Sequence, residues 1–499
     1  MNKYDIIIIG SGLGGLECGY ILSKNGYKVA ILEKNAKLGG CLQTFERDGV
    51  KFDTGMHYIG SMNKGEIMNR FFQYFNLTKD VKISRLNIDG HDIIRFNGEE
   101  YPLASGYDNF IDKLSGKFPK NRSEITDYIT KIRAIANDSP LYNLQKLNNS
   151  FFIENKAIKT NINDFLASII SNDTLRNVLA GNLPLYAGVK DQTPNYYYAM
   201  INNLYIQSAY RIIGGSDIIA ESLANSIHSF GGEIFTKSEV VKIICDENKA
   251  KGVLLADGTI IEGNYIISNI HPQVTLQKLD SNLIRKSYRT RINEIKNTIS
   301  NFTVYIKFKE NTTPYLNYNY YFYDSNTVWD SFSYEINKWP NSYLFMHQCN
   351  KEGQKFSKSA KLIGFMKFDE VKKWENSSVG KRGSDYLEFK EEKAKLLLDK
   401  LEISFPGIKN SIEHYYTSSP LTYRDYTATS EGSMYGIEHN INYPMQTLIS
   451  QRTKIPNFFL TGQNINSHGI FGVTIGAIIT CAEFLGINFI INDIEKSNN

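Results

Sequence analysis

The sequence predicts an α/β protein in which a parallel sheet domain is interleaved with an α+β domain that holds a mixed or antiparallel sheet. Tyr4–Ile9 and Tyr27–Leu32 are short, mostly apolar runs, as expected for strands buried on both faces of a parallel sheet. Asn301–Phe308 instead reads as an amphipathic strand. The 499 residues can fill more than one core.

A glycine-rich turn joins the two apolar runs. The pattern GxGxxG begins at Gly10, the segment Leu16–Asn25 has helical spacing, and Glu33 closes the second strand. In such a unit Gly12 lets the backbone approach a pyrophosphate at the helix N-terminus, and Gly15 lets the helix pack closely on the strand. Glu33 can accept both ribose hydroxyls. These positions together predict a dinucleotide-binding βαβ unit.

The residues after this unit favour FAD over NAD. A second glycine pair, Gly39–Gly40, follows the acidic residue, and Phe52–His57 supplies a strand end and a small-residue turn. This extension resembles the FAD-dependent amine oxidase and phytoene desaturase superfamily, which implies a Rossmann-like FAD-binding domain of the glutathione reductase type. Cys41 has no cysteine partner nearby, so the dithiol chemistry of the disulfide reductases is excluded.

The C-terminal part carries the second element of this resemblance. Phe458–Thr461 reads as a strand, and a glycine-containing loop leads to a helix expected from about Val473. By resemblance, Asn464 would contact the ribityl chain or pyrophosphate, although many flavoproteins have Asp there. Gly472 and Val473 would face the flavin, where the helix dipole stabilises negative charge on the reduced ring.

The middle of the chain adds strands between Glu233 and Asn269, as is typical of this fold. By resemblance, Val240 or Val241 would contact the adenine, and a purely structural role as strand core is an equally good interpretation. Four short motifs resemble the branch of retinol saturases, carotenoid isomerases and bacterial phytoene desaturases. They are Ser268–Pro272, Pro420–Arg424, Gly432–Gly436 and Thr461–Asn464.

We therefore expect two interleaved domains. The FAD-binding domain is expected to comprise residues 1–75, 205–275 and 450–495, and the substrate-binding domain residues 76–204 and 276–449. We expect helices at Asn121–Asn137 and Asn163–Ala180, and a solvated outer helix at Ser384–Leu401. The apolar stretch Gly469–Ile491 reads as a buried helix leading into a final strand rather than a membrane span.

The resemblance implies a flavin-dependent enzyme that transfers a hydride between FAD and a carbon–carbon bond of a hydrophobic polyene or isoprenoid-like lipid. Desaturation and saturation are one reaction run in opposite directions, so the direction stays open. The electron partner also stays open, with NAD(P)H as one external donor. Three alternatives remain: a flavin-dependent cis–trans isomerase of a polyene, an amine oxidase, and a non-catalytic carrier of prenylated lipids.

Candidate proton-handling groups lie in the segments expected near the flavin. They are His57, Tyr435 and His468, with His439 as a further candidate, because a histidine titrates near neutral pH. For each of them, a hydrogen-bonded structural role is the competing interpretation. Arg424 could instead anchor a polar end of the substrate.

The pattern and the resemblance together assign a larger set of residues to cofactor binding. These residues are Gly10, Gly12, Gly14, Gly15, Glu33, Lys34, Gly39, Gly40, Thr54, Gly55, His57, Val240, Val241, Gly462, Asn464, Gly472 and Val473.

The composition of the chain limits the binding partners and the cellular compartment that we expect. The net charge is only +4 and no basic block is present, so we expect no nucleic-acid partner. The five cysteines show no zinc spacing and no disulfide framework, so we expect no metal and a reducing compartment. A strand begins directly after Lys3, so we expect no signal peptide. We expect a cytoplasmic protein, with peripheral contact to the inner membrane face as an open alternative, and an AT-rich bacterial source.

Overall fold

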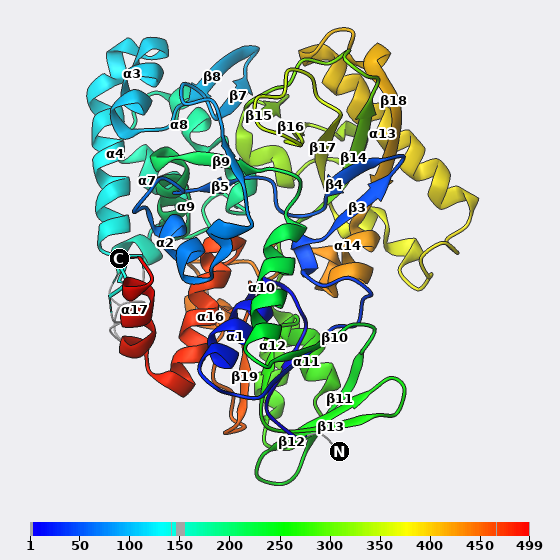
Figure 1. The fold of residues 1–499 in the computed structure, drawn as a ribbon. Helices are drawn as coiled ribbons and strands as arrows, with labels where there is room; N and C mark the ends of the chain where they lie inside the picture. The colour runs from blue at the N-terminus through cyan, green and yellow to red at the C-terminus, as the bar shows by residue number, and fades with distance from the viewer. Residues whose placement is uncertain (1–2, 141, 146–154, 466, 499) are drawn as a thin grey trace.

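A computed structural model describes residues 3–140, 142–145, 155–465 and 467–498. Two large sheets occupy opposite halves of the molecule (Figure 1). The first has the order β10-β2-β1-β13-β12-β11, with β19 also pairing with β13. Its strands are β1 (Lys3–Ile9), β2 (Val29–Leu32), β10 (Glu233–Phe235), β11 (Val240–Cys245), β12 (Ala250–Leu255), β13 (Ile260–Ser268) and β19 (Phe458–Leu460).

The helices lie mostly outside the two sheets. They are α1 (Leu13–Lys24), α2 (Ile67–Tyr74), α3 (Tyr107–Lys117), α4 (Arg122–Asn137), α6 (Lys156–Lys159), α7 (Ile162–Ala167), α8 (Asp173–Ala180), α9 (Asn195–Gln207), α10 (Asp217–Ser229), α11 (Pro272–Lys278), α12 (Lys286–Glu294), α13 (Ser384–Ser404), α14 (Pro420–Thr427), α15 (Pro444–Thr447), α16 (Gly469–Leu485) and α17 (Ile487–Lys496).

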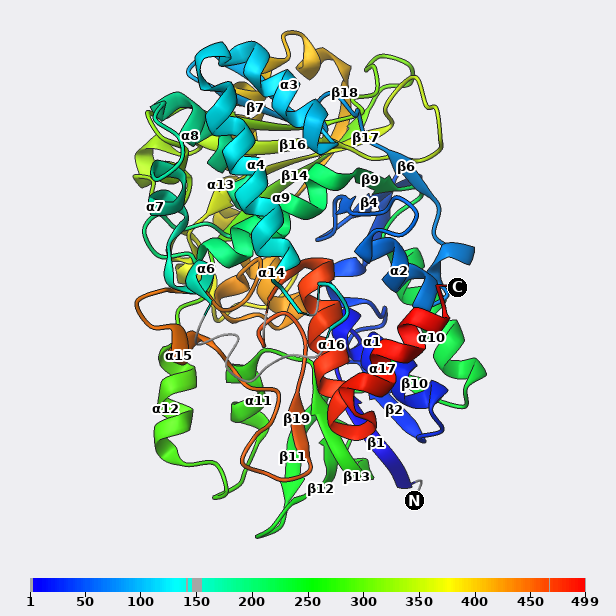
Figure 2. The ribbon, with the colours of Figure 1, turned by 90° about the vertical axis from the view of Figure 1, so that its left-hand side faces the viewer.

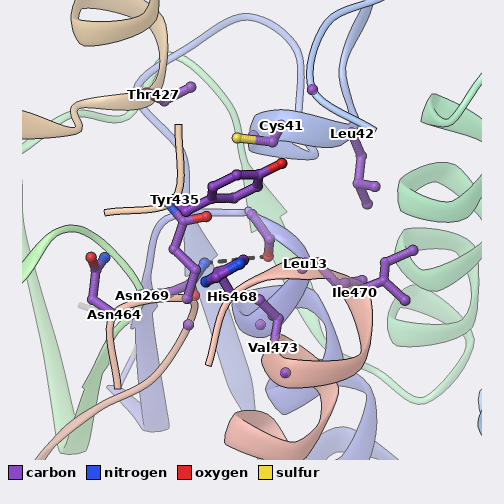
Figure 3. Close-up of a pocket in the computed structure, with 18 of the residues that line it drawn as sticks. Leu13, Cys41, Leu42, Asn269, Thr427, Tyr435, Asn464, His468, Ile470 and Val473 are labelled. Carbon is purple, nitrogen blue, oxygen red and sulfur yellow. Dashed lines mark hydrogen bonds between the residues drawn. The ribbon is translucent and has the colours of Figure 1, made fainter. Parts of the chain in front are cut away.

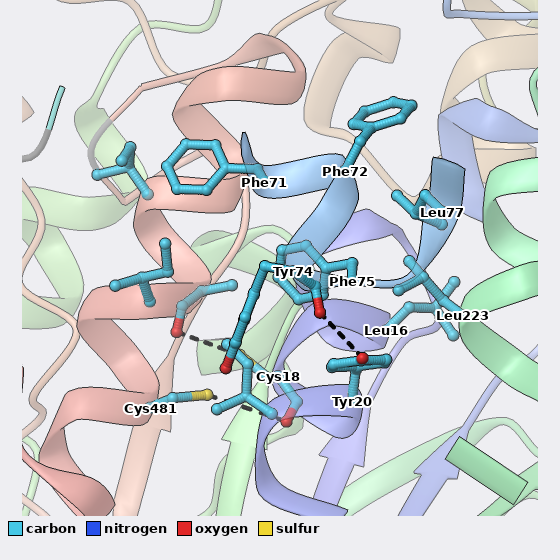
Figure 4. Packing of buried hydrophobic residues seen from close by; sticks show 14 of the residues in the cluster. Leu16, Cys18, Tyr20, Phe71, Phe72, Tyr74, Phe75, Leu77, Leu223 and Cys481 are labelled. Carbon is cyan, nitrogen blue, oxygen red and sulfur yellow. Dashed lines mark hydrogen bonds between the residues drawn. The ribbon is translucent and has the colours of Figure 1, made fainter. Parts of the chain in front are cut away.

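The first sheet is parallel where the sequence predicts buried strands. Strand β1 pairs in parallel with β2 and with β13, and β13 pairs in parallel with β19. Ile6, Ile7 and Ile8 are all fully buried, because both faces of β1 are covered. On one face, α1 packs between α10 and α16, and their side chains meet those of α2 in the core shown in Figure 4, where Leu16, Tyr20 and Phe71 lie.

The second sheet is mixed, as expected. Its order is β18-β14-β17-β16-β15-β7-β8, and only the β15–β7 pair is parallel. The strands are β7 (Asp92–Phe96), β8 (Glu99–Leu103), β14 (Ser300–Phe308), β15 (Asn319–Tyr323), β16 (Ser342–His347), β17 (Ser359–Met366) and β18 (Ile412–Ser418). Two short sheets, β3 (Thr44–Arg47) with β4 (Val50–Asp53), and β5 (Ile59–Gly60) with β9 (Ala209–Ile212) and β6 (Ile83–Arg85), complete the strands.

Helices cover both faces of the second sheet. Alternate strand residues enter two separate cores, one with α3, α4, α8 and α9 and the other with α13 (Figure 2). The helix α13 is therefore not only a solvated outer helix, because Leu397 and Leu401 are buried against the sheet. The helix expected at Asn163–Ala180 is interrupted, and its second half, α8, starts afresh with Asn172 capping the Leu175 amide.

One further segment differs from expectation. The chain after α16 forms a second helix, α17, and not a strand, because Ile487, Ile490, Ile491 and Ile494 recur at helical spacing and the last three are buried. Residues 276–295, which we expected in the substrate-binding domain, contribute Leu276 to the core under the first sheet. The domain boundaries themselves remain a prediction.

Among the described residues, no single helix has the length and apolar character to cross a membrane. The α16–α17 pair has that length and composition together, but the two helices are bent by 118° relative to each other.

The packing of α1 on β1 generates a stability prediction. A Cβ added to Gly15 would lie 2.2 Å from the carbonyl oxygen of Gly10, and both atoms belong to the tight turn. We expect Gly15→Ala to lower the free energy of unfolding by about 1–3 kcal/mol, seen as a lower apparent Tm. Gly116→Ala is the matched control, because nothing lies within 4 Å of its added Cβ. Equal apparent Tm values for the two variants would contradict this packing.

Candidate functional site

One cavity reaches from the glycine turn after β1 into the space between the two halves of the molecule. It is lined by most of the residues that the sequence assigns to the site. These are Gly10, Gly12, Gly14, Glu33, Lys34, Gly39, Gly40, Gly55, His57, Val240, Tyr435, Gly462, Asn464, His468, Gly472 and Val473. Segments from both ends of the sequence and from its middle therefore meet at one place.

The first glycine turn is held by a residue that the sequence analysis assigned no role. Asn269 follows β13 and lines the cavity (Figure 3). Its Nδ2 donates to the carbonyl oxygens of Gly10 and Gly12, at 3.3 Å each. A Cβ on Gly14 would lie 2.9 Å from Asn269 Oδ1 and 3.1 Å from Gly462 Cα. Glycine is thus required here by close approach. The signal for Asn269 was its place at the end of a strand beside β1.

The second glycine pair lies directly against the first. The Gly39 amide donates to the Ser11 carbonyl at 3.0 Å, and a Cβ on Gly40 would lie 3.1 Å from Gly12 Cα. Gly39 has φ of 106°, in the region that favours glycine. The two glycine segments form one backbone cradle.

Glu33 is buried and preorganised. Its Oε2 accepts from the Ser11 amide at 3.0 Å and from Ser11 Oγ at 2.7 Å, and its Oε1 accepts from the Asn35 amide at 2.8 Å. The carboxylate also lines the cavity. It can therefore accept hydrogen bonds from a diol at the cavity end nearest β2.

The N-terminus of α16 faces the cavity. The helix starts at Gly469, four residues before the expected start, so Gly472 completes its first turn and Val473 follows directly after it (Figure 3). A Cβ on Gly472 would lie 2.6 Å from the Ser467 backbone, which explains the glycine. Free amides and the positive end of the helix dipole favour negative charge in this part of the cavity.

Three residues assigned to the cofactor do not line the cavity. Gly15 lies behind the turn, where it lets α1 approach Gly10. Thr54 Oγ1 donates to the Gln43 carbonyl at 2.7 Å. Val241 is 40% exposed, whereas Val240 is buried and lines the cavity, because neighbouring strand residues point to opposite faces.

His57 joins the two halves of the molecule. Its Nδ1 lies 2.7 Å from Nζ of Lys361, which comes from β17 in the middle of the second sheet and is buried. Burial and the nearby ammonium hold the pKa of His57 well below its usual value. Burial also lowers the pKa of Lys361 to about 8, against the effect of Asp53. Lys361 was not predicted, since its segment contains none of the motifs on which the resemblance depends.

Tyr435 and His468 form a stacked pair at the cavity wall, with ring centroids 4.3 Å apart (Figure 3). His468 Nε2 lies 3.1 Å from the Leu185 carbonyl, so this nitrogen carries the ring proton and donates it. Burial lowers the pKa of His468 to about 4, and the ring is neutral at pH 7. The ring N–H of His468 is thus already hydrogen-bonded, which favours a structural role in the cavity wall over a role in proton transfer.

Two further candidates lie outside the cavity lining. His439 stacks on Tyr197 with centroids 4.1 Å apart, and burial lowers its pKa to about 3. Arg424 donates to the Glu375 carbonyl at 2.7 Å and to the carboxylate of Asp425. Among the described residues, no group of three His, Cys, Asp or Glu side chains could hold a metal ion.

The cavity wall away from Glu33 is largely apolar and aromatic. Its lining there includes Met68, Tyr142, Leu185, Met200, Leu204, Tyr205, Met434, Ile470 and Phe471. Such a wall suits an elongated apolar molecule, with the glycine cradle and α16 at its other side.

The sequence of this chain is similar to those of several known proteins. The family of NAD(P)-binding Rossmann-like domains matches residues 8–75. The all-trans-retinol 13,14-reductase of Rattus norvegicus is 28% identical over 98% of this chain and 86% of its own length. Prolycopene isomerase 1 of an Oncidium hybrid cultivar is 23% identical over 96% and 83%. A 4,4'-diapophytoene desaturase of a Methylomonas species is 24% identical over 67% and 69%. The bacterial source remains a prediction.

Solved structures show the same fold. An oxidoreductase from Methanosarcina mazei has a TM-score of 0.65 and 18% identity, covering 96% of this chain and 99% of its own. A putrescine oxidase variant has a TM-score of 0.65 and 13% identity, covering 99% of each chain. The α/β fold with a Rossmann-like dinucleotide-binding part is thereby confirmed.

The buried lysine generates a prediction about pH and stability. Lys361 loses its proton near pH 8 in the folded protein but near 10.5 in the unfolded chain. Between these values the unfolded state binds more protons, so this group adds stability as the pH rises, by up to roughly 3 kcal/mol. As the pH rises from 8 to 10.5, we expect the apparent Tm of the wild type to increase relative to that of Lys361→Met. Parallel Tm curves for the two proteins would contradict the burial of a charged Lys361.

Proposed function

Because this chain fits the phytoene desaturase and retinol saturase-like family of oxidoreductases, we propose that it binds FAD non-covalently and acts on a polyene lipid. In this reaction a hydride passes between the flavin and a carbon–carbon bond of a hydrophobic polyene or isoprenoid-like molecule. One observation carries the proposal. A single cavity combines a dinucleotide cradle with an apolar and aromatic wall.

The residues present fit FAD. At Gly12 and Gly40 an added Cβ would lie only 3.1 Å from its nearest neighbour, so glycine at these positions would let a pyrophosphate approach the backbone closely. Glu33 is placed to accept the ribose hydroxyls, and Val240 lines the cavity near this end. The N-terminal end of α16, with Gly472 and Val473, fits a flavin ring that becomes negative on reduction.

When bound, FAD supplies the hydride chemistry at its ring nitrogen N5. The chain itself supplies orientation and a dry environment. Met200, Leu204 and Phe471 exclude water from the apolar wall and can hold a flat polyene beside the first turn of α16.

Of the three proton-handling candidates in the lining, burial raises the pKa of Tyr435 and His468 already donates its ring proton to the Leu185 carbonyl. We therefore assign to His57 the exchange of a proton with the carbon next to the one that exchanges the hydride.

The direction of the reaction follows from an anaerobic experiment on the purified full chain. All-trans-retinol and 4,4'-diapophytoene serve as probes, and the flavin absorption band is followed with and without NAD(P)H. Bleaching by 4,4'-diapophytoene alone indicates a desaturase. Bleaching by NAD(P)H followed by recovery of the band on adding all-trans-retinol indicates a saturase, in line with the rat relative.

The competing functions give other results. Isomers of prolycopene formed on the reduced protein, with no change in the band, would indicate the isomerase, which the Oncidium likeness favours as second candidate. Peroxide released from an amine would indicate an amine oxidase. A yellow protein that binds these lipids but never changes its flavin band or its lipid would overturn the proposal in favour of a carrier.

Glu33 gives a separate prediction for cofactor binding. Glu33→Gln removes a charged acceptor from a buried site, which costs about 1.5–3 kcal/mol, so the Kd for FAD should rise by about 10- to 100-fold. Quenching of flavin fluorescence during titration measures this Kd. Glu46→Gln, at an exposed position on β3, is the control and should leave the Kd unchanged. Wild-type affinity in Glu33→Gln would exclude the proposed ribose contact.

A further inference from the structure

A buried lysine stands behind the histidine that lines the cavity. His57 belongs to the loop between β4 and β5, beside the dinucleotide cradle, and contacts the cavity directly. Lys361 does not line the cavity, but its Nζ lies 2.7 Å from His57 Nδ1. Lys361 is only 4% exposed, so a hydrophilic side chain has been placed in the interior with its end against one ring nitrogen.

The contact fixes the proton on the histidine ring. An ammonium group can only donate, so His57 Nδ1 must accept. His57 is neutral, because burial and the Lys361 charge lower its pKa and outweigh a hydrogen bond with the Met56 backbone, which raises it. A neutral imidazole with Nδ1 as acceptor carries its single proton on Nε2. The ring is therefore held in one tautomer. Its Nδ1 accepts a hydrogen bond from the Lys361 ammonium, and its Nε2 carries the proton that the ring can give away.

Other charged groups near the pair are few and can be named. Asp53 at the end of β4 favours the charged form of Lys361, and its carboxylate accepts from the Ser216 amide at 2.7 Å. Arg211 on β9 disfavours the charged forms of both Lys361 and His57. Arg211 donates to the Tyr318 carbonyl at 2.6 Å and to Asn319 Oδ1 at 2.9 Å. Asp53 thus raises the pKa of Lys361, and Arg211 lowers it.

We propose that Lys361 and His57 form a proton relay, in which Lys361 is the positioning residue and proton source and His57 passes the proton to or from the lipid. The inference rests on the proposed function and assigns its proton-handling group. It also gives the second sheet a part in the chemistry, because β17 carries Lys361.

The relay balances in the saturating direction. The His57 Nε2–H bond breaks as a C–H bond forms on the carbon next to the one that receives the hydride. The Lys361 Nζ–H bond breaks as an Nδ1–H bond forms on His57. The lipid gains a hydride, whose two electrons come from the reduced flavin, and one proton. Lys361 is left as a neutral amine and His57 as the other neutral tautomer. A proton taken up from water at His57 Nε2, with the Nδ1 proton passing back to Lys361 Nζ, restores the starting state. Desaturation runs the same steps in reverse.

Lys361→Arg separates proton supply from positioning. Arginine keeps a donor for Nδ1 but does not give up its proton. In the holoenzyme, we expect this variant to lower kcat for the lipid that the wild type converts by about 10²-fold, with the Kd for FAD unchanged. Lys393→Arg is the matched control, because Lys393 is also buried but is ion-paired with Glu370 and does not line the cavity.

The pH profile provides the second readout. In the saturating direction the relay needs protonated Lys361, so wild-type kcat should fall as the pH rises through about 8. In Lys361→Arg, kcat should show no such fall near pH 8. A Lys361→Arg enzyme with wild-type kcat and the wild-type fall near pH 8 would overturn the relay. A wild type that converts no lipid would instead overturn the proposed function.

A third readout needs no turnover. In the ¹⁵N spectrum of histidine-labelled protein without lipid, the His57 signal can be assigned by its loss in His57→Gln. We expect an unprotonated Nδ1 and a protonated Nε2 at pH 7 in the wild type and in Lys361→Arg. In Lys361→Met this tautomer should no longer be fixed. A protonated Nδ1 in the wild type at pH 7 would overturn the relay even if the enzyme is active.

Discussion

The hydrogen bonds from Asn269 to the first glycine turn are the constraint on which the site depends. One amide group holds the carbonyl oxygens of both Gly10 and Gly12, and the Gly462 backbone packs against the same turn. Three strands of one sheet end here, β1, β13 and β19, and they are neighbours in space although they are distant in sequence. In open α/β sheets ligands bind at the carboxyl ends of such strands, and the cavity begins at this point.

The second sheet completes the cavity from the other side. It supplies no part of the glycine cradle, yet Lys361 on β17 contacts His57. The residues with the chemical roles are thus divided between two cores that are built from interleaved segments of the chain. Because the second sheet supplies no part of the glycine cradle, its loops and strands can change without disturbing the cradle.

Sequence patterns were sufficient for the parts of the fold that depend on local rules. The buried strands β1 and β2 and the turn at Gly10 follow from periodicity and from the geometry that glycine allows. Strand β14 was expected to be amphipathic, but it is buried along nearly its whole length because helices cover both faces of its sheet. The start of α16 was placed four residues late, because its first turn consists of residues that also suit a loop. The α17 segment was misread as a strand, since short apolar runs fit both periods.

The contacts that could not be predicted are all long-range. Asn269 and Lys361 act through partners 257 to 304 residues away in the sequence, and no local pattern shows such pairs. The choice between Val240 and Val241 depended on which face of β11 meets the cavity, and two identical neighbouring side chains give no sign of that in the sequence.

The central claim is that the glycine turn after β1 and the first turn of α16 enclose one flavin. Its most direct measurement is the absorption spectrum of the purified full chain after FAD is added and unbound FAD is removed by gel filtration. The account predicts one FAD retained per chain and a yellow protein. A folded chain that stays colourless under these conditions would contradict it.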